Sequence, residues 1–236
     1  MRLDKFLQEK FNLKSRTYAE NLVLTSRVKV DGIIVQKPSL DVGENSIVEI
    51  VEDENYASQG AYKLAHAVQI FSLSLKDKCC LDIGCSNGGF CDVLLRNGAC
   101  KITAVDVAEC ALDERILKDE RVTFLRANAR ELPLDGESFD FVCSDVSFIS
   151  LTYILNEIFR VLRISGECVL LVKPQFELEK SALDKNGIVK SEKLRQSALD
   201  KIVDFAKGVG FSVAGTGVSP VRYQNKNVEY LLHLKK

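Results

Sequence analysis

The 236-residue sequence has few of the features that mark metal sites and membrane proteins. Its eight cysteines form no Cys-x-x-Cys pair, and only His66 and His233 could supplement them as ligands. Its apolar runs are too short to cross a bilayer. These absences predict a protein with no metal site and no stable membrane association.

The N-terminus also lacks the apolar core and the small-residue cleavage site of a secretory signal. We therefore expect a cytoplasmic protein whose cysteines are reduced, and buried thiols on strands are the default expectation for them. The composition, with 46% hydrophobic and 28% charged residues, is that of a globular protein. The length allows one ordinary domain with a small companion.

The charges are unevenly distributed, although the net charge is only -1. Residues 1–30 contain seven lysines and arginines against three acidic residues, whereas residues 31–60 contain one against seven. This pattern predicts a basic face followed by an acidic hairpin and linker.

Two short helices and a small sheet are predicted at the N-terminus. Leu3, Phe6, Leu7 and Phe11 recur at helical spacing, and a second amphipathic stretch begins at Ser15, a suitable N-cap. Strands follow at residues 28–30, 33–35 and 46–50, with Asp31-Gly32 as a hairpin turn between the first two. This order resembles the S-four (S4) RNA-binding domain.

The resemblance implies that basic side chains of this domain neutralise RNA phosphates. For charge density alone, an ordinary solvated helix face would be the default interpretation. The residues expected to contact RNA are Arg2, Lys5, Lys14, Arg16, Arg27 and Lys29.

Beyond residue 60 the pattern alternates between helix and strand. Strands are predicted at residues 79–83, 102–106, 122–126, 139–145 and 167–173, and a terminal hairpin at 211–218 and 227–235. Such alternation predicts an α/β fold, with a largely parallel Rossmann-like sheet and helices on both faces. The expected domains are 1–50 and 60–236, joined by a polar linker at 51–59.

A glycine-containing loop follows the first strand of this sheet, which is where an open α/β sheet binds its cofactor. Ser86 stands where a dinucleotide-binding loop requires its second glycine, so the loop favours S-adenosylmethionine over NAD. Asp106 ends the next strand, where a carboxylate can accept hydrogen bonds from ribose hydroxyls. The expected cofactor residues are Asp82, Gly84, Ser86, Asn87, Gly88, Gly89, Phe90, Asp106, Val107, Asn128, Ala129 and Asp145.

Four further segments carry a family resemblance that spans nearly the whole chain. Residues 58–64, 144–151, 172–177 and 227–230 resemble the TlyA (hemolysin A) family, whose members are similar to FtsJ-type methyltransferases. The resemblance implies S-adenosylmethionine-dependent 2′-O-methylation of a cytidine in ribosomal RNA, with 23S RNA favoured. The ribosomal RNA or a ribosomal subunit would be the partner.

The family's catalytic Lys-Asp-Lys-Glu tetrad corresponds to Lys63, Asp145, Lys173 and Glu229. A ribose hydroxyl is a poor acid, so Lys173 is expected to act as base or to orient the hydroxyl. Asp145 would position Lys173, while Lys63 and Glu229 would hold the ribose. Isolated charges are more often surface lysines, caps and edge-strand residues. Four matched segments favour the catalytic interpretation.

Two other classes of function stay open at this point. The family's second name suggests a membrane-acting haemolysin, although the sequence has no long basic amphipathic helix. The chain could also be a non-catalytic ribosome-assembly factor, or a methyltransferase of small molecules. Methyl transfer to ribosomal RNA distinguishes these hypotheses.

Overall fold

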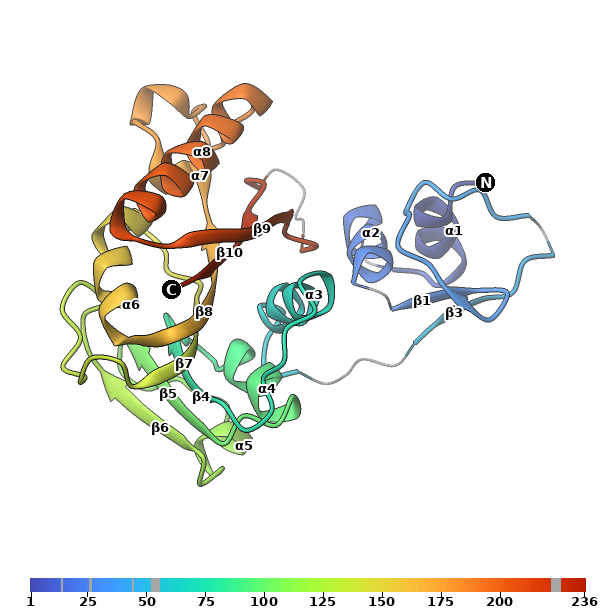
Figure 1. The fold of residues 1–236 in the computed structure, drawn as a ribbon. Helices are drawn as coiled ribbons and strands as arrows, with labels where there is room; N and C mark the ends of the chain where they lie inside the picture. Colours follow the sequence, from blue (N-terminus) through green and yellow to red (C-terminus); the bar gives the residue numbers. More distant parts are fainter. Residues whose placement is uncertain (14, 26, 44, 52–55, 222–225) are drawn as a thin grey trace. The chain divides into compact units, whose positions relative to one another are not determined.

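The computed structural model describes residues 1–13, 15–25, 27–43, 45–51, 56–221 and 226–236. The chain divides into two compact units, Met1–Asn55 with Pro220–Lys226, and Tyr56–Ser219 with Asn227–Lys236 (Figure 1). The domain boundaries expected from the sequence stay a prediction. Residues 52–55 of the expected linker and Lys14 lie outside the described residues.

The first unit is a small α+β domain, as predicted. Helices α1 (Leu3–Lys10) and α2 (Arg16–Leu24) precede a sheet in the order β2 (Ile33–Ile34), β1 (Val28–Val30), β3 (Val48–Ile50), with both pairs antiparallel. Ser15 is the N-cap of α2, and its Oγ accepts a hydrogen bond from the Tyr18 amide at 3.1 Å. The core consists of Leu3, Leu7, Ala19, Leu22, Val23, Val28, Val30 and Val42.

The second unit is built on a seven-stranded sheet in the order β6-β5-β4-β7-β8-β10-β9. Strands β4 to β8 run parallel, and β10 runs antiparallel to both β8 and β9, so the predicted parallel sheet and terminal hairpin are confirmed. The strands are β4 (Cys79–Ile83), β5 (Lys101–Asp106), β6 (Val122–Arg126), β7 (Phe139–Ser144), β8 (Leu162–Val172), β9 (Ser212–Val218) and β10 (Tyr230–Lys235).

Strand β8 begins five residues before the position expected from the sequence. Its first part, residues 162–166, contains exposed Arg163 and Ile164 and a positive φ of 65° at Ser165. Ile164 is exposed, and Ser165 and Gly166 separate it from the buried run that follows, which explains why the pattern placed the start of the strand at Glu167.

Helices cover both faces of this sheet (Figure 1), as expected of the Rossmann-like fold. Because successive strand residues point to opposite faces, Cys80 lies in the same core cluster as Leu64 and Phe90, whereas Leu81 lies in the other cluster with Ile158 and Ile202. The first face carries α3 (Ala61–Ile70), α4 (Gly89–Arg96) and α5 (Glu114–Leu117). The other carries α6 (Leu155–Val161) and α8 (Glu192–Val209). Short helices η1 (Leu151–Tyr153), α7 (Pro174–Glu177) and η2 (Lys180–Ala182) follow β7 and β8.

The cysteines are free thiols, five of them buried: Cys80, Cys85, Cys91, Cys143 and Cys168. In the described ranges, no group of three or more potential ligands could hold a metal ion. No helix among the described residues is long and apolar enough to span a membrane.

Candidate active site

The glycine loop lies where the order of the parallel strands reverses, because β5 and β6 lie on one side of β4 while β7 and β8 lie on the other. Gly84 has a φ of 83°, and a Cβ there would come within 3.3 Å of the Asp145 backbone. Gly88 has a φ of 85°, and its Cβ would lie 2.7 Å from Cδ1 of Ile116. Glycine therefore allows this loop to pack closely on its neighbours.

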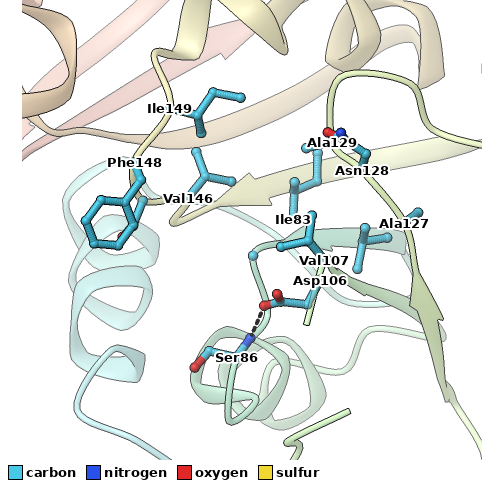
Figure 2. A pocket seen from close by; sticks show the side chains of 13 residues that line it. Ile83, Ser86, Asp106, Val107, Ala127, Asn128, Ala129, Val146, Phe148 and Ile149 are labelled. Atoms are coloured by element: carbon cyan, nitrogen blue, oxygen red, sulfur yellow. Dashed lines mark hydrogen bonds between the residues drawn. The ribbon is translucent and has the colours of Figure 1, made fainter. Parts of the chain in front are cut away.

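A cavity of about 420 Å³ opens beside this loop (Figure 2). Such a volume suits a small-molecule cofactor. Among the residues expected to bind the cofactor, the lining contains Gly84, Ser86, Asp106, Val107, Asn128 and Ala129. It also contains residues that the sequence reasoning did not select: Ile83, Val105, Ala127, Val146, Ser147, Phe148 and Ile149. The last four directly follow Asp145, and that adjacency was the signal that could have revealed them.

The chemistry of the cavity fits S-adenosylmethionine. Asp106 lies at the end of β5, and its two carboxylate oxygens accept hydrogen bonds from the Ser86 and Ala108 amides, each at 3.0 Å. Each oxygen retains a further acceptor site, which a ribose hydroxyl could use. Val107, Ala127 and Ala129 provide an apolar wall suited to a purine ring.

The other expected cofactor residues lie around the cavity rather than in its lining. Asp82 is fully buried, and its Oδ2 accepts a hydrogen bond from the Cys91 thiol at 3.1 Å. Phe90 is part of the core, and Gly89 packs against Ser58 and Ala61. Asn87 donates to the Ala111 carbonyl at 3.3 Å.

Asp82 carries an unusual charge environment. Burial raises its pKa to about 7, against an ordinary value of 3.8, and the Cys91 hydrogen bond offsets this only partly. Within the described residues, its Oδ1 has no hydrogen-bond partner. A buried, unpaired acceptor beneath the glycine loop fits the ammonium group of a bound methionine moiety.

The structure brings all four residues of the expected tetrad together. Lys63 on α3 lies 3.0 Å from Oδ2 of Asp145 and 2.7 Å from Oε2 of Glu229. Lys173 lies 2.7 Å from Oδ1 of Asp145 and donates to Oγ of Ser147, also at 2.7 Å. Asp145 therefore bridges the two lysines, and Ser147 joins this network to the wall of the cavity.

For Lys63 and Asp145, opposite charges outweigh the effect of burial on the pKa. Burial lowers the pKa of Lys63, but Asp145 and Glu229 outweigh it, so the net pKa is raised. Burial likewise raises the pKa of Asp145, but Lys63 and Lys173 outweigh it, so the net pKa is lowered. Two lysines and two carboxylates, all largely buried, thus compensate one another.

The N-terminal unit places two of the expected RNA contacts on one buried carboxylate. Nη2 of Arg2 lies 2.7 Å from Oδ2 of Asp4, and Nη2 of Arg16 lies 2.8 Å from the same atom. Burial raises the pKa of Asp4, but hydrogen bonds from both arginines and from the Lys5 amide hold it below its ordinary value. The two guanidinium groups stay about half exposed and are held side by side.

The remaining expected RNA contacts that the structure describes are Lys5, Arg27 and Lys29. Lys5 lies 3.7 Å from Glu9 on the same helix, and Lys29 is the middle residue of β1. Arg27 precedes that strand and is partly buried.

Comparisons with known proteins agree with this architecture. The FtsJ-like methyltransferase model matches residues 56–236, and the S4 domain model matches residues 1–48. The protein is therefore an FtsJ-like methyltransferase with an S4 domain. Within that class it belongs to the TlyA (hemolysin A) family.

Two relatives support this assignment along nearly the whole chain. Hemolysin A of Brachyspira hyodysenteriae is 35% identical, and 99% of each chain is covered. The 16S/23S rRNA (cytidine-2′-O)-methyltransferase TlyA of Mycobacterium tuberculosis is also 35% identical, covering 99% of this chain and 89% of that protein. A solved structure described as a hemolysin, from Lactococcus lactis, has a TM-score of 0.74 at 40% identity, covering 78% of this chain and 90% of the other.

Proposed function

We propose that this protein transfers a methyl group from S-adenosylmethionine to the 2′-hydroxyl of a cytidine in ribosomal RNA, with 23S RNA as substrate. One observation carries the proposal: the Lys63, Asp145, Lys173 and Glu229 network adjoins the cofactor cavity through Ser147. Relatives named as rRNA (cytidine-2′-O)-methyltransferases support the choice of substrate.

In this reaction S-adenosylmethionine supplies an electrophilic methyl group next to the tetrad. The 2′-hydroxyl must lose its proton as its oxygen attacks, and Lys173 either accepts that proton or orients the hydroxyl. Asp145 fixes the Lys173 amine at 2.7 Å, while Lys63 and Glu229 hold the ribose and the rest of the network. For the cofactor itself, Asp106 would hold the ribose, and Asn128 and Ala129 would contact the adenine.

The S4 domain would bring the RNA to this site. Its basic side chains neutralise phosphates and set the orientation of the RNA without reading bases. The proposed contacts are Arg2, Lys5, Lys14, Arg16, Arg27 and Lys29.

The test is transfer of labelled methyl to 16S and 23S RNA and to both ribosomal subunits, with the product mapped as 2′-O-methylcytidine. We expect a single modified cytidine in 23S RNA or in the large subunit. Absence of transfer to any ribosomal substrate would refute the function, and the non-catalytic assembly factor would then be favoured. Lysis of lipid vesicles by the purified protein would revive the haemolysin.

Lys173→Ala tests the mechanism. We expect this variant to lose methyl transfer while keeping its affinity for S-adenosylmethionine, because Lys173 contacts Asp145 and Ser147 rather than lining the cavity. The matched control is Lys180→Ala, an exposed lysine on η2. Full activity of the Lys173 variant would remove this residue from the mechanism.

A further inference from the structure

A buried carboxylate outside the tetrad lies close to the two segments that contain Asp145 and Lys173. Glu177 is the last residue of α7, four positions after Lys173, and only 1% of its side chain is exposed. Neither the cofactor cavity nor the lysine network includes it.

The carboxylate of Glu177 accepts two hydrogen bonds from the segment that follows Asp145. Its Oε2 accepts from Oγ of Ser150 at 2.5 Å, and its Oε1 accepts from the Leu151 amide at 2.9 Å. The backbone carbonyl of Glu177 also accepts from Nζ of Lys201 on α8 at 2.7 Å. Glu177 therefore ties the chain after β8 to the chain after β7.

Two other contacts join the same pair of segments nearer the reacting atoms. Lys173 contacts Asp145 and Ser147, and the rings of Phe148 and Phe176 pack with centroids 5.1 Å apart. Residues Val146 and Phe148 between these contacts form a wall of the cofactor cavity (Figure 2). Displacing Ser150 and Leu151 would thus shift Asp145 relative to Lys173.

Stability alone does not account for a carboxylate at this position. Burial raises the pKa of Glu177, and the hydrogen bonds from Ser150 and Leu151, with the charge of Lys201, only partly offset the rise. The ionised side chain therefore costs folding free energy, as incompletely compensated buried charges do. The Ser150 hydroxyl and the Leu151 amide each donate to one carboxylate oxygen. Glutamine has a single side-chain oxygen, so it could accept only one of these two hydrogen bonds in the same geometry.

We propose that Glu177 is a positioning residue, which holds the Asp145 segment in register with Lys173 through Ser150 and Leu151. This inference rests on the proposed RNA 2′-O-methylation. In this role Glu177 sets the position of Asp145 relative to Lys173 and touches neither the RNA nor the cofactor.

The experiment measures kcat, the KM for RNA and the affinity for S-adenosylmethionine in the full-length protein. For Glu177→Gln we expect kcat to fall at least about ten-fold, since a displacement of roughly 1 Å can cost about a hundred-fold in rate. The KM for RNA and the cofactor affinity should stay within about two-fold, because Glu177 does not contribute to binding. Glu179→Gln, an exposed glutamate two residues away, is the matched control and should behave as the wild type.

Ser150→Ala provides a second variant on the opposite side of the contact. This variant should also lower kcat. The double variant should have the same kcat as Glu177→Gln alone, because both substitutions disrupt the same hydrogen bond between Ser150 and Glu177. Additive losses would show that the residues act independently and would overturn the proposal. So would a lowered melting temperature with unchanged kcat, which is the result of a purely structural role.

The wild-type protein separates the two levels of inference. If it transfers no methyl to ribosomal RNA, the proposed function fails. If it does so and Glu177→Gln matches it in kcat, the proposed function stands and the positioning role is wrong.

Discussion

At the scale of single residues, Asp82 links the cofactor loop to the stability of the fold. Its pKa is raised by burial to about 7, so the folded chain binds its proton more tightly than the unfolded chain, where the pKa is 3.8. The contribution of this group to the free energy of unfolding must therefore fall as the pH rises from 3.8 towards 7 and stay constant above.

We predict that Asp82→Asn stabilises the protein at pH 8, by up to a few kcal/mol, and that the gain shrinks as the pH falls from about 7 towards 3.8. The same variant should bind S-adenosylmethionine less tightly, because it removes the carboxylate beneath the loop. Denaturant unfolding at several pH values measures the first effect, and calorimetric titration the second. Asp135→Asn, at an exposed position, is the control. A pH-independent difference in stability would contradict the assignment.

Individual residues also show what a sequence pattern can and cannot reveal. The segments around Lys63, Asp145, Lys173 and Glu229 were recognisable, although the bridging position of Asp145 became visible only in three dimensions. The contact of Glu177 with Ser150 spans 27 positions, so no local spacing predicts it. Burial of Asp82 and Glu177 depends on tertiary packing, and their pKa shifts follow from that burial.

At the scale of elements, the loop between β4 and α4 depends on glycine for two separate reasons. Gly88 has a positive φ of 85°. Its missing Cβ also leaves room for the side chain of Ile116 on helix α5. Gly187 has a similar φ of 74°, but nothing lies within 4 Å of its Cβ position. A comparison of substitutions at Gly88 and Gly187 therefore distinguishes the cost of backbone strain from the cost of steric overlap.

We predict that Gly88→Ala destabilises the protein more than Gly187→Ala does. Both variants should lose about 1 kcal/mol through the positive φ, and only the first must also displace Ile116. Gly88→Ala should additionally weaken cofactor binding, because the loop beside the cavity moves. Thermal unfolding and cofactor titration of the two variants give the comparison. Equal losses in both would mean that the contact with Ile116 yields without cost.

The elements themselves were largely predictable because each carries a local signal. The helical spacing of Leu3 and Leu7, the N-cap Ser15 and the buried run of β4 all produced the expected structures. The start of β8 did not follow, because Leu162 pairs with Phe139 of β7 while the regular pairing with β7 and β10 begins at Glu167.

At the scale of the whole molecule, the proposed RNA binding is an electrostatic property of the N-terminal domain. Arg2 and Arg16 are unsuitable for testing it, because removing either one weakens the compensation of the buried Asp4 and mixes stability with binding. Lys5 and Lys29 support no such buried group in the described part of the chain. They therefore report on phosphate contacts more directly.

We predict that Lys5→Gln and Lys29→Gln each weaken RNA binding at low salt. Every lost phosphate contact should reduce the slope of log affinity against log salt concentration by about 0.7 to 0.9, because one fewer counterion is released. Binding titrations over a series of salt concentrations measure this slope, and cofactor affinity should stay unchanged. Lys101→Gln is the control, since this exposed lysine begins β5, at the end of the strand opposite Asp106 and the cavity. Unchanged slopes for both S4 variants would mean that neither side chain contacts phosphate, and that other groups supply the electrostatic part of RNA binding.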